Sequence, residues 1–269
     1  MDSNNRENTI VMAGESFKEE RWQEILAILD QHGRVRVGRL AALLNVSEAT
    51  VRRDLETMQA QGLLQRTHGG AMLTRSTAFE VSFDESQSKS QAEKRAIGQR
   101  AAALVQDGDS LIIESGSTTL EFARCLGDFR KLTVLTNSLA IAKELSVNEQ
   151  IEVMLLGGTL RRQSASLVGP WVSEILRGVR VDRAFLGVNA LSAEFGISAP
   201  NPFTAESRRA MLTAARTSVA LADHSKLGHE ALYLVAPLDT LDILVTDAGA
   251  NEAQLAPIRE AGVDVLIAG

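Results

Sequence analysis

The chain has 269 residues, 45% of them apolar, and a formal net charge of −6. This length predicts two unequal domains, and the apolar content excludes a mainly disordered protein. A single cysteine, Cys125, excludes an intrachain disulfide framework, and the polar N-terminal segment predicts neither a signal peptide nor a membrane anchor. We therefore expect a cytoplasmic protein.

Charge is distributed unevenly along the chain. Residues 31–75 contain seven arginines and three acids, a local charge of +4, which leaves −10 for the remainder. A small basic module on a larger acidic body is the asymmetry expected of a DNA-binding domain joined to a second domain.

Helical periodicity organises residues 17–73, the expected first domain, which follows an expected flexible tail at 1–16. Apolar side chains recur at helical spacing in 18–33 and again in the short segment 37–44. Asn45 and Val46 predict a tight turn, after which Ser47 can cap a third helix that runs to about residue 61.

The third helix has two distinct faces. Its apolar residues must pack on the first two helices, and these are Val51, Leu55 and Met58. The opposite, polar side carries Ala49, Thr50, Arg52, Arg53, Glu56 and Thr57. A short helix, a tight turn and a polar-faced helix with arginines are typical of a helix-turn-helix motif, whose second helix enters the DNA major groove.

A β-hairpin is expected directly after this helix. Residues 63–64 and 71–73 predict two short strands around the turn 67–70. Such a hairpin forms a wing, with Arg66 and His68 at its tip for the phosphate backbone or the minor groove. A basic three-helix unit could instead bind a protein, with its arginines forming a solvated face. The wing, the local charge and the Ser47 cap together favour DNA.

The stretch "RWQEILAILDQHGRVRVGRLAALLNVSEATVRRDLETMQAQGLLQRTHGGAML" closely resembles the N-terminal winged helix of the DeoR family of bacterial transcriptional regulators. The combination of "VSEATVRRDL" with "GLLQRTHGGA" is more specific to that family than a bare helix-turn-helix. The resemblance implies operator binding by residues 47–53 and by the wing 66–70. The expected DNA-binding residues are Arg36, Ser47, Glu48, Ala49, Thr50, Arg52, Arg53, Thr57, Arg66, His68 and Gly69.

Residues 74–90 are rich in Ser, Thr and charge and predict a linker, which Phe79 and Phe83 could fasten to the larger domain. From residue 91 to 269, continuous apolar runs alternate with helical patterns. The runs expected as strands are 110–114, 132–136, 151–156, 183–188, 218–223, 243–247 and 263–269. This alternation predicts a mostly parallel α/β sheet.

Several of these strands are followed by loops of small, hydroxyl-bearing or basic residues, where α/β sheets bind ligands. Backbone N–H groups of 116–119, at a helix start, can hold a phosphate dianion. The expected effector-binding residues are Glu114, Ser115, Gly116, Ser117, Thr118, Thr119, Asn137, Gly157, Gly158, Arg161, Lys226 and Asp247. One such loop alone does not distinguish a phosphate site from a turn whose Gly, Ser and Thr only cap a helix.

The resemblance continues through "EKRAIGQRAAALVQDGDSLIIESGSTTLEFA", "VMLLGGTLRRQSASLVGP" and "DRAFLGVNAL". These stretches resemble the DeoR sensor domain, which is similar to ribose-5-phosphate isomerase and binds phosphorylated sugars. The implied fold class is α/β, with a small winged helix-turn-helix domain joined to a larger, mostly parallel, sugar-phosphate-isomerase-like sensor domain. The chain departs from the family pattern at Glu114, Thr204, Arg208 and His224, where Asp, Glu, Lys and Ser are usual.

Catalysis is the alternative function, because aldose–ketose isomerisation needs a carboxylate base and Glu114, Glu206 and Asp247 are candidates by position. A metabolic isomerase has no use for a basic winged helix, so we expect a sensor. The chain lacks the motifs G-x-x-x-x-G-K-[ST] and G-x-G-x-x-G, and His224 and His229 lack a third ligand, so no cofactor or metal is expected.

The sequence thus predicts a repressor of a sugar-catabolism operon. It would bind operator DNA as a homo-oligomer, a dimer or a tetramer, and would be released by a phosphorylated sugar. A DNA-packaging protein is a third possibility, which predicts neither sequence preference nor a ligand effect.

Overall fold

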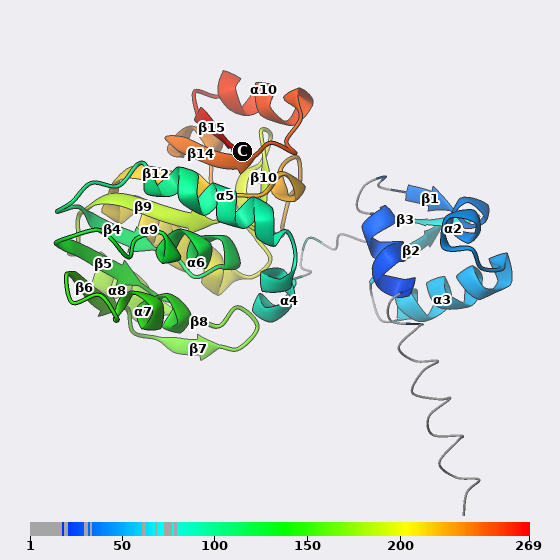
Figure 1. Cartoon of the computed structure of the whole chain (residues 1–269), viewed down its shortest axis with the longest axis horizontal. Helices are drawn as coiled ribbons and strands as arrows, with labels where there is room; N and C mark the ends of the chain where they lie inside the picture. The colour runs from blue at the N-terminus through cyan, green and yellow to red at the C-terminus, as the bar shows by residue number, and fades with distance from the viewer. Residues whose placement is uncertain are drawn as a thin grey trace, which may run out of the picture. The chain divides into compact units, whose positions relative to one another are not determined.

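A computed structural model of the chain describes residues 18, 21–29, 32, 34–60, 63–67, 69–72, 77 and 80–269, without the side chains of residues 60, 65 and 72. The expected tail at 1–16, His68 and Phe79 lie outside these residues. The chain divides into two compact units, Met1–Ser76 and Thr77–Gly269 (Figure 1). Each unit is described by itself.

The smaller unit is a winged helix-turn-helix. Residues 21–29 are helical, and the elements after them are β1 (Arg34–Arg36), α2 (Val37–Leu44), α3 (Glu48–Ala60), β2 (Gln65–Thr67) and β3 (Gly70–Met72). The strands form an antiparallel sheet in the order β1-β3-β2. Asn45, with φ of 52°, ends α2 in the left-handed conformation, as the expected tight turn requires.

The strands of the wing differ in their bounds and number from the sequence prediction. Strand β2 begins at Gln65 rather than at Leu63, and β1 is a third strand that was not predicted. Leu64 is 1% exposed and packs in the core beside Leu55 and Met58. Leu64 is therefore apolar because it packs in the core. A short apolar run in the sequence cannot show whether its residues pack in a core or pair in a strand.

The larger unit is built on a parallel sheet of seven strands in the order β15-β14-β12-β9-β4-β5-β6. Their bounds are β4 Ser110–Ile113, β5 Leu132–Thr136, β6 Ile151–Leu155, β9 Val181–Gly187, β12 Ala215–Leu221, β14 Ile243–Asp247 and β15 Asp264–Ala268. All seven expected strands are confirmed within a few residues at their ends. The chain proceeds in opposite directions from β4 and β9, so these neighbours form the switch point where such sheets bind ligands.

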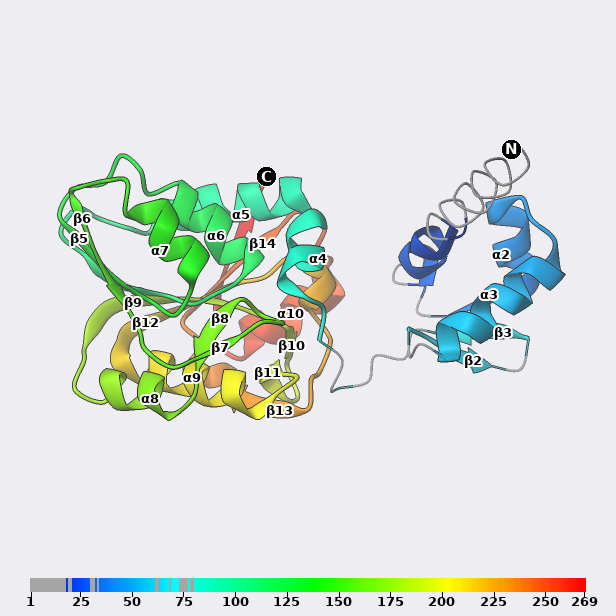
Figure 2. The same ribbon diagram turned by 90° about the horizontal axis from the view of Figure 1, so that it is seen from below.

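Helices cover both faces of the sheet (Figure 2). One face carries α5 (Gln91–Ala102), α6 (Ser117–Arg124) and α7 (Leu139–Leu145), and the other carries α8 (Pro170–Leu176), α9 (Pro202–Ala214) and α10 (Glu252–Glu260). Alternate strand residues supply two separate cores, so that Leu111 and Ile113 face α5 and α6 while Ile112 faces the other layer. Burial on both faces explains the continuous apolar runs in the sequence.

Short elements that the sequence did not reveal complete the unit. They are the hairpin β7 (Thr159–Arg161) and β8 (Ser166–Val168), the antiparallel sheet of β10 (Ala190–Ser192), β11 (Gly196–Ala199) and β13 (Tyr233–Ala236), and the 3-10 turns η1 (His224–Lys226) and η2 (Leu238–Thr240). Within the expected linker, Phe83–Ser88 form helix α4, whose Ser82 hydroxyl accepts a hydrogen bond from the Glu85 N–H at 3.2 Å. Phe83 packs partly buried against the core, as one of the two expected phenylalanine contacts.

Candidate nucleic-acid interface and anion site

Helix α3 buries one face and exposes the other. Val51, Leu55 and Met58 are fully buried, as expected from their spacing. The Ser47 hydroxyl accepts a hydrogen bond from the Thr50 N–H at 3.1 Å, which confirms the expected N-cap and anchors the start of the helix.

The predicted DNA-binding residues of the exposed face differ in whether another side chain already pairs with them. Arg52 pairs with Glu48 at 2.6 Å, and Arg66, on strand β2, pairs with Glu56 at 2.8 Å. Among the described residues, the Arg53 guanidinium has no hydrogen-bond or ion-pair partner, so its donors are available. Ala49 is exposed and Thr50 and Thr57 are half-buried beside it, while Arg36 and Gly69 are exposed elsewhere in the unit.

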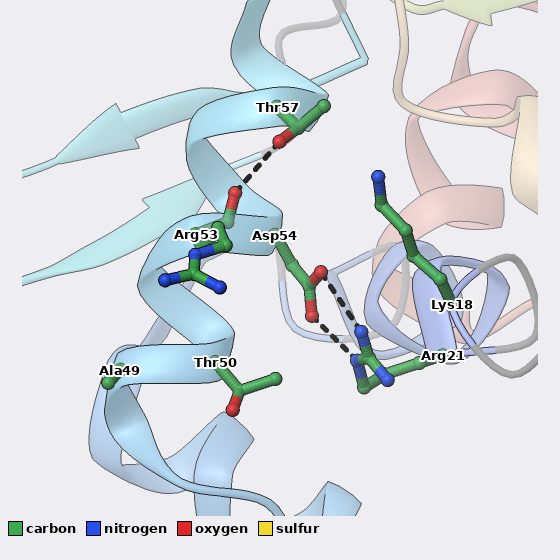
Figure 3. Close-up of a pocket in the computed structure, with 7 residues that line it drawn as sticks. All are labelled: Lys18, Arg21, Ala49, Thr50, Arg53, Asp54 and Thr57. Atoms are coloured by element: carbon green, nitrogen blue, oxygen red, sulfur yellow. Dashed lines mark hydrogen bonds and ion pairs between the residues drawn. The ribbon is translucent and has the colours of Figure 1, made fainter. Parts of the chain in front are cut away.

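A groove of about 350 Å³ runs beside this face, lined by Lys18, Arg21, Ala49, Thr50, Arg53, Asp54 and Thr57 (Figure 3). The Asp54 carboxylate is buried and accepts hydrogen bonds from Arg21 Nε at 2.6 Å and from Trp22 Nε1 at 3.1 Å. The hydrogen bond to Asp54 raises the pKa of Arg21, although burial opposes this. Sequence reasoning missed this pair, which fastens α3 to the first helix, residues 21–29.

In the larger unit, the carboxyl ends of β4 and β9 bring a carboxylate and a guanidinium together. Glu114 is 2% exposed, and its Oε2 accepts hydrogen bonds from the Gly187 N–H at 3.1 Å and from Arg208 at 3.3 Å. Arg208 also donates to Asn189 Oδ1 at 2.6 Å. Burial raises the pKa of Glu114, and Arg208 partly offsets this effect. Two of the four departures from the family pattern are thus direct partners.

The loop after β4 is built by its own polar groups. Asn137 Oδ1 accepts from the Ser115 N–H at 2.9 Å, and its amide nitrogen donates to the Leu167 carbonyl at 3.1 Å. The Thr119 hydroxyl donates to the Gly116 carbonyl at 3.0 Å. By contrast, the Thr118 hydroxyl has no hydrogen-bond partner among the described residues, so this side chain remains available at the start of α6.

A buried lysine from α5 joins this loop. Lys94 is 3% exposed, and its ammonium donates to the carbonyls of Ser86 and Lys89, the latter at 2.7 Å. Ser86 in turn shares a hydrogen bond of 2.9 Å with the Ser117 hydroxyl. Burial lowers the pKa of Lys94 to about 8, with Asp223 opposing this shift. Lys94 was missed because a single lysine between charged neighbours, Glu93 and Arg95, is typical of a solvated surface residue.

Lys226 and Asp223 act electrostatically on Lys94 from the loop after β12. Burial alone would raise the pKa of Asp223, but the charge of Lys226, the hydroxyl of Ser225 and the charge of Lys94 outweigh it, so this pKa lies below its usual value. Two ammonium groups, the Ser117 and Thr118 hydroxyls and the first N–H groups of α6 therefore gather at one edge of the sheet. This is the chemistry of an anion site.

Of the remaining predicted effector residues, Arg161 and Asp247 have protein partners in this structure. Arg161 pairs with Glu80 at 2.5 Å, and Asp247 accepts from His224 Nδ1 at 2.7 Å and from the Gly249 N–H at 2.9 Å. Gly158 has a φ of +137°, and a Cβ there would lie 2.6 Å from the Val168 carbonyl oxygen, so close packing of the hairpin accounts for it. Gly157 precedes it in the same loop.

The three carboxylates considered for isomerisation do not share a site. Glu206 is exposed on α9, where its Oε1 accepts from the Ser173 hydroxyl at 3.3 Å. Glu114 follows β4 and Asp247 is the last residue of β14, and these two strands are separated by β9 and β12. Within the described part of the chain, no group of three or more His, Cys, Asp and Glu side chains could hold a metal ion, and no helix is both long and apolar enough to span a membrane.

Comparison with protein families gives two matches. The family described as DeoR C terminal sensor domain matches residues 89–248, and the DeoR-like helix-turn-helix domain matches residues 21–77.

Individual relatives extend over nearly the whole chain. HTH-type transcriptional repressor GlcR of Bacillus subtilis is 38% identical over 251 residues, covering 93% of this chain and 96% of its own. HTH-type transcriptional regulator GolR of Listeria innocua is 32% identical, with coverages of 94% and 99%. Among solved structures, ribose 5-phosphate isomerase A from Methanocaldococcus jannaschii is similar with a TM-score of 0.36 and 20% identity, covering 51% of this chain and 54% of its own.

Proposed function

Because the chain belongs to the DeoR family of transcriptional regulators, we propose that it binds operator DNA with α3 and the wing. We propose that it dissociates from the operator when a phosphorylated sugar occupies the anion site. Like the family and the relatives, it is a DNA-binding regulator and not an enzyme. The anion site is defined by Lys94, Ser117, Thr118 and Lys226. Its occupant and its effect on DNA are the proposal.

On the DNA side, Arg53 is the proposed base-reading residue, since a guanidinium can donate two hydrogen bonds to guanine. The exposed pairs of Arg52 with Glu48 and of Arg66 with Glu56 are weak enough to open or to rearrange on phosphate contact. One reading helix covers few base pairs, so we propose a homo-oligomer, a dimer or a tetramer, on paired half-sites. To bind its operator the protein must share a compartment with the chromosome, so we propose that it is cytoplasmic.

On the ligand side, the burial of Lys94 is the observation that carries the proposal. A buried ammonium is costly unless an anion or several acceptors compensate it. A phosphate dianion could do so while it accepts from the Ser117 and Thr118 hydroxyls and from the N–H groups at the start of α6. We propose Glu114, Arg208 and Asn189, at the adjacent switch point, as the partners of sugar hydroxyl or carbonyl oxygens.

The test is operator release. A binding sequence is first selected from random DNA with the full-length protein, and fluorescence anisotropy then follows release by D-ribose 5-phosphate, D-glucose 6-phosphate and D-fructose 1-phosphate, with the unphosphorylated sugars as controls. We expect at least one phosphorylated sugar, and no free sugar, to lower operator affinity. Lys226→Ala and Thr118→Ala should retain operator binding and lose this response, whereas Lys143→Ala, an exposed lysine on α7, should retain both.

The proposal fails if no sugar phosphate releases DNA, and two further outcomes would contradict it. The ligand site would be wrongly placed if Lys226→Ala and Thr118→Ala responded to sugar phosphate as the wild type does. The regulatory role of the site would fail if wild-type protein converted D-ribose 5-phosphate or D-glucose 6-phosphate to its ketose isomer with steady turnover.

A further inference from the structure

Residues 80–89, near the start of the larger unit, form a segment that we call the strap. Its first part is held by Glu80, whose carboxylate pairs with Arg161 at 2.5 Å and accepts from the Asn201 amide at 3.2 Å. The Glu80 carbonyl also accepts from the Gln163 amide at 3.0 Å. These contacts come from the β7–β8 hairpin and from the N-cap of α9, so the strap is fastened at a defined position.

The second part of the strap is helix α4, which is held by the anion site itself. Lys94 donates to the carbonyls of Ser86 and Lys89, at the C-terminal end of α4, and the Ser86 hydroxyl is bonded to that of Ser117. The Ser86 carbonyl also accepts from the Lys89 N–H at 3.3 Å, so the Lys94 ammonium is a second, charged donor to this end of the helix. The same two side chains, Lys94 and Ser117, form part of the proposed phosphate site.

We propose that Lys94 and Ser117 are shared between the effector phosphate and helix α4, so that phosphate binding withdraws them from α4 and loosens the strap. Two of the three Lys94 donors go to the Ser86 and Lys89 carbonyls, and phosphate oxygens are stronger acceptors for them than peptide carbonyls are. A ligand seated on Ser117 and Lys94 therefore competes with Ser86 and Lys89. This inference rests on the proposed function of the anion site.

The position of the strap in the chain gives the competition a consequence. The boundary between the two units falls at Ser76–Thr77, so the strap begins within a few residues of the point where the reading unit joins the larger one. A regulator that reads two half-sites needs its reading units at a fixed spacing. Loosening α4 leaves the strap held by the Glu80 contacts alone, which widens the range of positions that each reading unit samples, and operator affinity falls. By linkage, operator binding must lower the affinity for the ligand by the same factor.

The experiment first uses the ligand-free, full-length protein, so that it does not depend on the identity of the effector. Hydrogen–deuterium exchange of residues 80–89 is measured for wild type, Lys94→Met and Ser86→Ala, with Arg95→Met, an exposed arginine of the same helix, as the matched control. We expect exchange in α4 to become about tenfold faster in Lys94→Met, as expected for losing a charge-assisted hydrogen bond. Operator affinity should fall in parallel, and Ser86→Ala should show the same changes to a smaller extent.

Unchanged exchange and operator affinity in both variants would overturn the proposal. Ser86→Ala keeps the proposal testable even if Lys94→Met misfolds. It removes only the hydroxyl contact with Ser117 and leaves the buried lysine in place. Circular dichroism melting curves check that each variant is folded.

The second arm adds the three sugar phosphates of the release assay. For a sugar phosphate that releases DNA, we expect faster exchange in α4 of the wild type, and release at lower concentration in Ser86→Ala because one competitor for Ser117 is gone. Release with unchanged or slower exchange in α4 would overturn the shared-residue proposal and leave the proposed function standing. If no sugar phosphate releases DNA, the proposed function fails, and the ligand-free arm still decides whether Lys94 holds the strap.

Discussion

Arg208 Nε lies 3.2 Å from Glu114 Oε1, and the two side chains are 5% and 3% exposed. The pair joins helix α9 to the end of β4 at the switch point of the sheet. Because both charges are buried, each depends on the other, and removing one leaves an unpaired charge without water.

The first prediction concerns this pair. Arg208→Met should lower the free energy of unfolding by about 3 kcal/mol, because it strands the Glu114 carboxylate. Adding Glu114→Gln should recover most of the loss. Urea denaturation of the two single variants and the double variant gives the coupling energy, and additive losses would show that the charges act independently.

The same pair gives a pH dependence. The folded-state pKa of Glu114 is raised from 4.5 by burial, so the folded state holds its proton to higher pH than the unfolded state does. Stability from this group is therefore present at low pH and is lost as pH rises through the raised pKa. In Arg208→Met the pKa should rise further, and the fall in stability should extend to higher pH. Urea denaturation at a series of pH values measures it, and a pH profile parallel to that of the wild type would contradict the assignment.

A second buried acid should control the smaller unit. Asp54→Ala removes a buried carboxylate that accepts from both Arg21 and Trp22, so we expect a loss of about 2–4 kcal/mol in stability. Operator binding should weaken as well, because α3 loses its attachment. Glu56→Ala, on the same helix but exposed, is the control and should cost less than about 1 kcal/mol. Equal effects of the two substitutions in thermal melts would refute the role of Asp54.

Arg53 should contribute to sequence reading. Arg53→Ala is expected to weaken binding to the selected operator by about 1–3 kcal/mol and to relax preference at one base position. Binding to unrelated DNA should change far less. Anisotropy titrations on the operator and on single-base variants measure both effects, with Arg95→Ala as the control; a uniform loss on all sequences would make Arg53 a phosphate contact instead.

Lys94 predicts a pH dependence of ligand binding. Its pKa is lowered to about 8 by burial, with Asp223 and Glu121 favouring the charged form and Lys226 and Lys89 opposing it. Sugar-phosphate affinity should therefore fall as pH rises through about 8, because the ammonium is lost. The folded state also binds fewer protons than the unfolded state up to 10.5, so stability should rise over this interval. Calorimetric titration measures the affinity, and Lys94→Met should abolish both trends.

Local patterns in the sequence determined the elements of this protein. The spacing of Val51, Leu55 and Met58 predicts the buried face of α3, Ser47 predicts its cap, and the apolar runs predict the seven parallel strands. Each of these depends on residues within a few positions of one another, where the backbone period dictates which side chains share a face.

The tertiary structure alone decided which polar groups meet. Glu114 and Arg208 are 94 residues apart, and Arg21 and Asp54 are 33 apart. Their contacts follow from strand order and helix packing, which no local period encodes. For the same reason the sequence pattern around Lys94 indicates a surface lysine, whereas the side chain lies buried beneath α4. The residues proposed to bind the phosphate and to hold the strap became visible as one cluster only once distant segments were packed together.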